Sequence, residues 1–390
     1  MNALASRWKV RAALVAVSVV LTAATAGLAR TKLVTLPARD MIRMDLKNPD
    51  HTLIEEERTI NLQKGVNRID FSWANVMIDK GSIQMRCIKA PGRVAVLNAN
   101  YPPNENALFW EVSSDKAGPG VFRISYLMSN ITREISYQAV ADHPEKNLVL
   151  DYFMTLKNFS GERLERCKVW LGYGRDFSKT LDNAESKKML SARFPGVPVH
   201  KVYVFDPSKT GPHVRMYYRL TNDKAHGLGL FPLENGKARI YQIDSEKTQA
   251  FLGEDWGQYT PLGNKMDLFL GLAKDVTVTR YVFREDKVNR RGVVYDLERE
   301  LRFEVQNFKD QTVPAILKEH PGGEWVIKSV VLQEERGERD EKVRKTIPHD
   351  EVVNLERLDV DNLDVTFKVP PTKGDLKYQL FVTMVLKNRW

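Results

Sequence analysis

Short runs in which apolar and polar residues alternate recur along most of the 390 residues of this chain. Leu53 to Gly65 is one such run, in which the apolar Ile60 and Leu62 alternate with polar neighbours. A period of two puts successive side chains on opposite faces of an extended strand, so each run predicts a half-buried β-strand. Turns rich in glycine, proline and asparagine separate the runs. The pattern predicts an all-β protein made of immunoglobulin-like β-sandwich modules in series.

Four segments carry more specific expectations about secondary structure. Val121 to Met128 and Ile135 to Ala141 predict two strands that pair with each other. Asp182 to Arg193 (DNAESKKMLSAR) predicts a short helix or a polar loop. Leu332 to Ile347 is rich in charge and contains Gly337, which predicts a solvated hairpin tip or a mobile loop.

A weak internal repeat supports the division into modules. Asp151 to Gly161 (DYFMTLKNFSG) and Glu300 to Asp310 (ELRFEVQNFKD) both alternate and then reach Asn-Phe, and Met216 to Asp223 (MYYRLTND) also ends on Asn. Asparagine tolerates a left-handed backbone and bonds to nearby backbone groups, so it suits the end of a strand. We expect a signal peptide at 1–29, an N-terminal β domain at 30–116, a central β domain at 117–284 and a C-terminal β-sandwich at 285–390.

The N-terminal segment has the pattern of a secretory signal peptide. Basic residues precede the apolar stretch Ala12 to Leu21, and Ala24-Thr25-Ala26 follows as a small-residue cleavage signature. An uncleaved anchor is the alternative, since the apolar stretch approaches the length of a membrane span. No other stretch of the sequence could form a transmembrane helix. The pattern predicts an extracytoplasmic location, whether periplasmic, cell-surface or secreted.

The formal net charge of +9 suits an acidic partner at the cell envelope, such as an anionic polysaccharide or a membrane surface. No run of five or more basic residues occurs, and acidic residues are interleaved throughout. These features argue against nucleic acid as the partner. A protein component of the envelope remains a further option, and the sequence does not indicate an oligomeric state.

The chain has two cysteines and seven histidines, which limits the disulfides and metal sites that it can form. Cys87 and Cys167 could form one disulfide outside the cytoplasm, or each could be a free cysteine in a strand. No two histidines have zinc-site spacing, and the acidic run near Asp361 lacks the glycine and the final glutamate of a calcium loop. We therefore expect no metal site and no cofactor.

The cluster Gly253 to Gly257 is the most site-like stretch, with Glu254, Asp255 and Trp256 between two glycines and Tyr259 close behind. It could be a structural turn, a binding surface in which the aromatic rings stack on a sugar, or an acid/base pair. Adjacent strand residues point to opposite faces, so Glu254 and Asp255 share a site only if the segment bends as a loop.

The longest family-specific motif lies within Ala238 to Arg280. Its portion AFLGEDWGQYTPLGNKMDLFLGLAKDVTVTR resembles the F-x-G-E, T-P-x-G and L-x-L-G-x-A-x-D-V run of the uncharacterised C-terminal domain of bacterial mucoidy-inhibitor-A-like proteins. Other segments resemble the same family, namely Leu62 to Phe71, Ile124 to Tyr137, Asn158 to Gly174 and Leu301 to Ile327. Arg133 stands where that family's pattern has Trp. The resemblance implies β-sandwich modules and an exported location, and it supplies no catalytic residues.

The sequence contains no nucleophile elbow, P-loop, dinucleotide-binding fingerprint or zincin helix. We therefore expect an exported, non-catalytic protein that binds or scaffolds at the cell envelope. One alternative is an extracytoplasmic carbohydrate-active hydrolase that uses Glu254 or Asp255, because glycoside hydrolysis needs only two carboxylates. Another is a structural protein that self-assembles through exposed strand edges.

Overall fold

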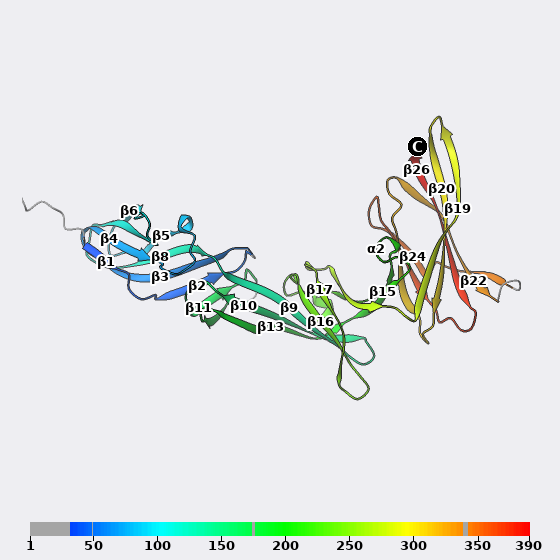
Figure 1. Cartoon of the computed structure of the whole chain (residues 1–390), viewed down its shortest axis with the longest axis horizontal. Coiled ribbons are helices and arrows are strands. Elements are labelled where there is room, and N and C mark those ends of the chain that lie inside the picture. Colours follow the sequence, from blue (N-terminus) through cyan, green and yellow to red (C-terminus); the bar gives the residue numbers. More distant parts are fainter. Residues whose placement is uncertain (1–31, 49, 174–175, 338–341) are drawn as a thin grey trace, which may run out of the picture. The chain divides into compact units, whose positions relative to one another are not determined.

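A computed structural model describes residues 32–48, 50–173, 176–337 and 342–390. These residues are nearly all β, as the alternating pattern predicts (Figure 1). They form two compact units, with unit 1 made of the described residues up to 133 and within 156–187, and unit 2 of those within 134–155 and 188–390. The predicted signal peptide at 1–29 lies outside the described residues. None of the described helices is long and apolar enough to cross a membrane.

Unit 1 contains a four-stranded and a six-stranded sheet, ordered β1-β4-β7-β6 and β12-β11-β2-β3-β8-β5. The first sheet comprises β1 (Lys32–Thr35), β4 (Gly65–Ser72), β7 (Ala107–Ser114) and β6 (Val94–Asn100). The second comprises β12 (Phe177–Leu181), β11 (Leu164–Trp170), β2 (Met41–Asp45), β3 (Thr52–Leu62), β8 (Gly118–Met128) and β5 (Gln84–Lys89), with the short helix η1 (Lys80–Ser82) before β5. The rings of Phe71 on β4 and Tyr126 on β8 lie 5.8 Å apart, so the two sheets share an aromatic core.

Three further sheets build unit 2, and their orders are β13-β10-β9-β16-β17, β18-β15-β14-β21-β25-β24 and β19-β20-β26-β22-β23. The first comprises β13 (Glu185–Pro198), β10 (Asn147–Asn158), β9 (Ile131–Ala141), β16 (Gly236–Ile243) and β17 (Gln249–Gly257), of which the first three run across the unit boundary. The second comprises β18 (Lys265–Leu272), β15 (Val214–Thr221), β14 (His200–Phe205), β21 (Val313–Glu319), β25 (Leu363–Val369) and β24 (Val353–Arg357). The third comprises β19 (Val276–Arg291), β20 (Val294–Asn307), β26 (Lys377–Arg389), β22 (Trp325–Arg336) and β23 (Val343–Ile347). Two short helices, α2 (Pro207–Thr210) and η2 (Lys224–His226), lie in connections.

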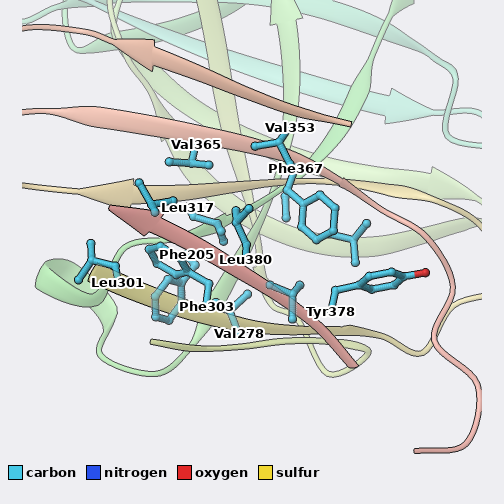
Figure 2. Close-up of a cluster of buried hydrophobic side chains, with 14 of the residues drawn as sticks. Phe205, Val278, Leu301, Phe303, Leu317, Val353, Val365, Phe367, Tyr378 and Leu380 are labelled. Atoms are coloured by element: carbon cyan, nitrogen blue, oxygen red, sulfur yellow. The ribbon is translucent and has the colours of Figure 1, made fainter. Parts of the chain in front are cut away.

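A hydrophobic core of unit 2 lies between its second and third sheets. Figure 2 shows Phe205 and Phe367 from the second sheet packed with Phe303 and Leu380 from the third. All four side chains are almost fully buried. The alternation of the strands explains this core, because every second residue of β20 and β25 turns inward and is apolar. This pair of sheets is a β-sandwich.

The sequence repeat marks a recurring buried asparagine. Asn158, Asn222 and Asn307 are all fully buried, and none of them has a left-handed backbone. Their shared role is therefore side-chain bonding, since buried backbone groups near a strand end need a partner.

Asn307 shows the bonding pattern. Its Nδ2 donates to the carbonyl oxygens of Gln311 at 2.8 Å and Val369 at 3.0 Å, and its Oδ1 accepts the N–H of Lys309 at 3.1 Å. Val369 stands opposite Val313, the first residue of the next strand. The asparagine thus joins the end of β20 in one sheet to the start of β21 and the end of β25 in the other.

Asn158 repeats this arrangement in unit 1. Its Nδ2 donates to the carbonyl oxygens of Glu162 at 2.7 Å and Leu181 at 3.2 Å, and its Oδ1 accepts the N–H of Ser160 at 3.2 Å. Leu181 stands opposite Leu164, the first residue of β11. The repeat in the sequence therefore corresponds to the same asparagine-bonded connection between strands in both units.

Two of the local expectations are wrong. Val121–Met128 and Ile135–Ala141 fall in β8 and β9, but β8 pairs with β3 and β5 while β9 pairs in parallel with β16. Asp182–Arg193 contains the start of β13 in place of a helix or loop. β13 is the edge strand of its sheet, where polar side chains on both faces can stay in water.

The charged segment Leu332 to Ile347, expected to be a hairpin tip or a loop, contains the paired ends of β22 and β23. Leu332 pairs with Ile347 and Arg336 with Val343, and the tip at 338–341 lies outside the described residues. The three β domains expected at 30–116, 117–284 and 285–390 stay a prediction. At the first of these boundaries, β8 continues the sheet that contains β3, because Gly118 stands opposite Leu62.

Candidate functional site

A cavity of about 480 Å³ lies over the outer face of the β18-β15-β14-β21 sheet in unit 2. We call this cavity the groove. Its floor comes from alternate residues of neighbouring strands, and one wall comes from the end of β17 and the segment that follows it. The lining residues used below are Asp206, Lys209, Arg215, Tyr217, Arg219, Asp255, Trp256, Tyr259, Lys265, Asp267, Phe269 and Lys318.

The floor of the groove is built by cross-strand pairs between β15 and β18. Tyr217 stands opposite Phe269, and their ring centroids are 5.6 Å apart. Arg219 stands opposite Asp267 and donates to both of its carboxylate oxygens, at 2.7 and 2.6 Å. Residues directly opposite in an antiparallel pair share a face, so the register itself sets this row of aromatic and charged groups.

Three of the four binding residues expected from the sequence line this groove. Trp256 is 66% exposed and Tyr259 is 56% exposed, which leaves large aromatic surfaces open to solvent. Asp255 also lines the groove, but its oxygens are occupied. Its Oδ1 accepts the N–H of Trp256 at 2.8 Å, and its Oδ2 accepts the N–H of Phe269 at 2.7 Å. Asp255 therefore positions the groove wall against the edge strand β18.

Glu254 is not part of the groove lining. Its carboxylate pairs with Lys237 at 2.7 Å and with Arg239 at 3.2 Å, both on β16. The hydrogen bond from Lys237 is the main cause that lowers the pKa of Glu254. The segment Gly253 to Gly257 belongs to strand β17 and not to a loop, and Glu254 and Asp255 have different partners. The two carboxylates thus do not form an acid/base pair.

The comparisons with known proteins assign no family to the chain. No family model and no curated protein matches the sequence. The groove's own side chains therefore carry the evidence for its chemistry.

Two cations of the groove were not singled out in the sequence. Among the described residues, no carboxylate lies within ion-pair distance of Arg215 or Lys265. The Arg215 guanidinium lies 5.3 Å from the ring centroid of Phe269, its Nη1 is 3.5 Å from the hydroxyl of Tyr217, and its buried Nε has no hydrogen-bond partner. Strand alternation alone could have placed Arg215 beside Tyr217 and Arg219, but the role of that face depends on the wall supplied by β17.

Asp206 closes the groove beside α2. Ser208 Oγ donates to its Oδ1 at 2.6 Å, and Nε2 of His320 lies 3.2 Å from the same oxygen. Burial opposes ionisation of Asp206, but the hydrogen bonds from Ser208 and His320 outweigh it and lower the pKa of the carboxyl. A general acid at neutral pH needs the opposite shift.

Unit 1 holds a second cavity of about 450 Å³. Beside it the fully buried Glu56 accepts hydrogen bonds from Arg39 and, at 2.9 Å, from Nε of Arg58, while Arg39 Nη2 also pairs with Glu162 at 2.6 Å. Each of these charges already has an opposite charge, as buried ions require. This network fits a structural role better than a ligand site.

Cys87 and Cys167 are both free, so the disulfide considered from the sequence does not form within this fold. Cys87 lies on β5 and Cys167 on β11, with β2, β3 and β8 between them. Four strand spacings of about 4.8 Å separate them by about 19 Å across the sheet. A disulfide requires Cα atoms within about 7 Å. In the part of the chain that the structure describes, no group of three His, Cys, Asp or Glu side chains could hold a metal ion.

Proposed function

We propose that the protein is exported and acts as a non-catalytic binding or scaffolding protein of the cell envelope. The N-terminal basic and apolar pattern supports export. The single observation that supports binding is the groove of unit 2, where the exposed rings of Trp256 and Tyr259 stand over a floor of aromatic and basic side chains. Concave sites with aromatic walls and a few convergent polar groups are the usual form of ligand sites.

The bonding of the groove carboxylates favours binding over hydrolysis. Asp255 accepts two backbone N–H groups, Asp267 takes the guanidinium of Arg219, and Asp206 has a lowered pKa. Glycoside hydrolysis needs one carboxyl that stays protonated near neutral pH and a second that is available as base or nucleophile. These three carboxylates instead hold strands and cations in place.

The test uses the protein without its first 29 residues and fractionated envelope material. Envelope polysaccharide and peptidoglycan are incubated with the protein, and retention of protein and release of reducing ends are measured together. We expect saturable, salt-sensitive retention without release. Release of reducing ends that Asp255→Asn abolishes would make the protein a hydrolase. The absence of both signals would contradict the proposal and favour a protein partner or self-assembly.

Export is tested separately, with the full-length chain expressed in a bacterial host. Cell fractions are separated, and the N-terminus of the mature protein is determined by mass spectrometry. Export with cleavage predicts an N-terminus within a few residues of Ala26 in the extracytoplasmic fraction. An intact N-terminus in the cytoplasmic fraction would contradict export.

A further inference from the structure

We infer that the groove of unit 2 binds a saccharide that carries acidic groups, and that Arg215 and Lys265 recognise those groups. This inference rests on the proposed binding function and adds the chemical class of the ligand. The class covers a carboxylate or a phosphate on the sugar, since a guanidinium and an ammonium bind both.

The aromatic side chains of the groove indicate that the ligand contains sugar rings. A pyranose ring presents a face of C–H groups that is apolar, and such a face packs on an aromatic ring with little loss of hydration at its hydroxyls. Trp256 and Tyr259 expose most of their rings at the groove, and Tyr217 and Phe269 form an aromatic pair in its floor. Four aromatic rings along one cavity suit more than one sugar unit.

The basic side chains of the groove indicate that the ligand carries acidic groups. The lining contains five basic residues, Lys209, Arg215, Arg219, Lys265 and Lys318, and three acidic residues, Asp206, Asp255 and Asp267. Arg219 is neutralised by Asp267, and Lys318 pairs with Asp364 at 2.9 Å. Lys209 reaches Asp206 only at 3.9 Å. Arg215 and Lys265 have no such partner among the described residues, so the groove holds positive charge that a ligand can offset.

The register of β15 and β18 sets the spacing of the two cations. Lys265 on β18 stands opposite Thr221 on β15. Arg215 is also on β15, six residues before Thr221. At about 3.3 Å per residue, these positions are about 20 Å apart along the strand. Tyr217 and Phe269 lie between them. The ligand is thus an extended chain of several sugar units with acidic groups near both ends.

A nucleic acid strand is the competing ligand for a basic, aromatic groove. The carboxylate of Asp255 stands in the lining between the two cations and accepts only backbone N–H groups, so a continuous phosphate backbone would meet its negative charge. A saccharide with spaced acidic groups avoids this carboxylate, which is why we favour the saccharide.

The experiment is isothermal titration of the protein lacking residues 1–29 with defined probes. Tetragalacturonate is compared with its fully methyl-esterified neutral form, and mannopentaose phosphate with mannopentaose, so that the carboxylate and phosphate sources are separated. Oligodeoxythymidylate of similar length is the nucleic acid probe. The variants are Arg215→Gln, Lys265→Gln and Trp256→Ala, and Arg239→Gln serves as the matched control because Arg239 pairs with Glu254 outside the groove.

We expect at least one acidic saccharide to bind and its neutral counterpart to bind at least tenfold more weakly. Arg215→Gln and Lys265→Gln should each weaken the acidic probe about tenfold, which is the usual cost of one charge-assisted hydrogen bond. Trp256→Ala should weaken it several-fold through lost stacking. Arg239→Gln should leave the affinity unchanged, and added salt should weaken binding because the groove charges are partly exposed.

Three results would overturn the inference. They are equal affinity for acidic and neutral saccharides, equal losses in Arg215→Gln and Arg239→Gln, and tighter binding of the oligonucleotide than of either acidic saccharide. If no saccharide probe binds while envelope material still retains the protein, the ligand class is wrong and the binding function stands. If envelope material also fails to retain the protein, the ligand class and the proposed binding function are both wrong.

Discussion

Asp255 Oδ2 accepts the backbone N–H of Phe269 at 2.7 Å, so a side chain from β17 satisfies a donor on the edge strand β18. This bond joins the first and second sheets of unit 2 at the groove wall. An edge strand presents N–H groups that lack a neighbouring strand, and a carboxylate is a strong acceptor for them. The residue that looked catalytic in the sequence is therefore a structural link beside the groove.

Asp255→Ala should lower the free energy of unfolding by about 2 kcal/mol, because hydrogen bonds to a charged group contribute about 1.5–3 kcal/mol. The measurement is urea unfolding followed by circular dichroism. Glu254→Gln is the neighbouring control and should leave the unfolding midpoint unchanged, since its carboxylate is exposed. Equal midpoints for the wild type and Asp255→Ala would show that the link contributes nothing.

Asn307→Ala should lower the free energy of unfolding by about 2–3 kcal/mol, since it removes the donor to the buried carbonyl of Val369, at about 1–3 kcal/mol, and the donor to the part-buried carbonyl of Gln311. Asn354→Ala on the exposed side of β24 is the matched control and should have almost no effect. Thermal and urea unfolding of both variants provide the comparison. A loss below that of the control would contradict the role of the buried asparagine at the corner between sheets.

Gly161→Ala should destabilise unit 1 strongly. A Cβ at this position would lie 1.9 Å from the carbonyl oxygen of Asn75, and φ is +92°. Gly65→Ala separates the two effects, because Gly65 has φ +99° but no atom within 4 Å of the added Cβ. Gly65→Ala should cost about 1 kcal/mol of backbone strain, and Gly161→Ala should cost clearly more in the same urea titration. Similar losses of unfolding free energy in Gly161→Ala and Gly65→Ala would mean that the backbone near Asn75 shifts at no cost to make room for the added Cβ.

Thiol titration should find two free cysteines in the denatured, unreduced protein. In the native protein Cys167 should react far more slowly than Cys87, because Cys167 is fully buried and burial raises its pKa to about 12. Burial also raises the pKa of Cys87, though a backbone hydrogen bond at Lys89 opposes the change. Alkylation followed by peptide mass spectrometry assigns the sites. A Cys87–Cys167 disulfide peptide would contradict the sheet order.

Acid should weaken the contribution of Asp206 to stability. Its pKa is lowered in the folded state from the ordinary value of 3.8, so the ionised carboxylate stabilises the fold at pH values above 3.8. That contribution is lost as the pH falls below 3.8 and through the lowered pKa. The measurement is the difference in Tm between the wild type and Asp206→Asn from pH 7 to pH 2, which should shrink only at the acid end. A difference that stays constant down to pH 2 would contradict this assignment.

The alternation of apolar and polar residues predicted a chain that is nearly all β, because the period of a strand is a property of the local backbone. It did not predict β13, which is polar on both faces at its start. The repeated Asn also marked real structural positions at Asn158, Asn222 and Asn307. The cluster Gly253 to Gly257 was singled out because two carboxylates stand beside an aromatic residue between glycines, a pattern that a turn, a binding surface and an acid/base pair all share.

Strand partners and the far side of the groove depended on tertiary structure. β8 and β9 follow each other in the chain and alternate alike, yet they enter different sheets, because pairing depends on which edges meet after folding. Arg215 lies far from Trp256 in the sequence, and Lys265 lies on a different strand from Trp256. Only the approach of β17 to β18 brings the three residues into one cavity. Local pattern decides which face of a strand is apolar, whereas the site requires contacts between strands that the local pattern does not encode.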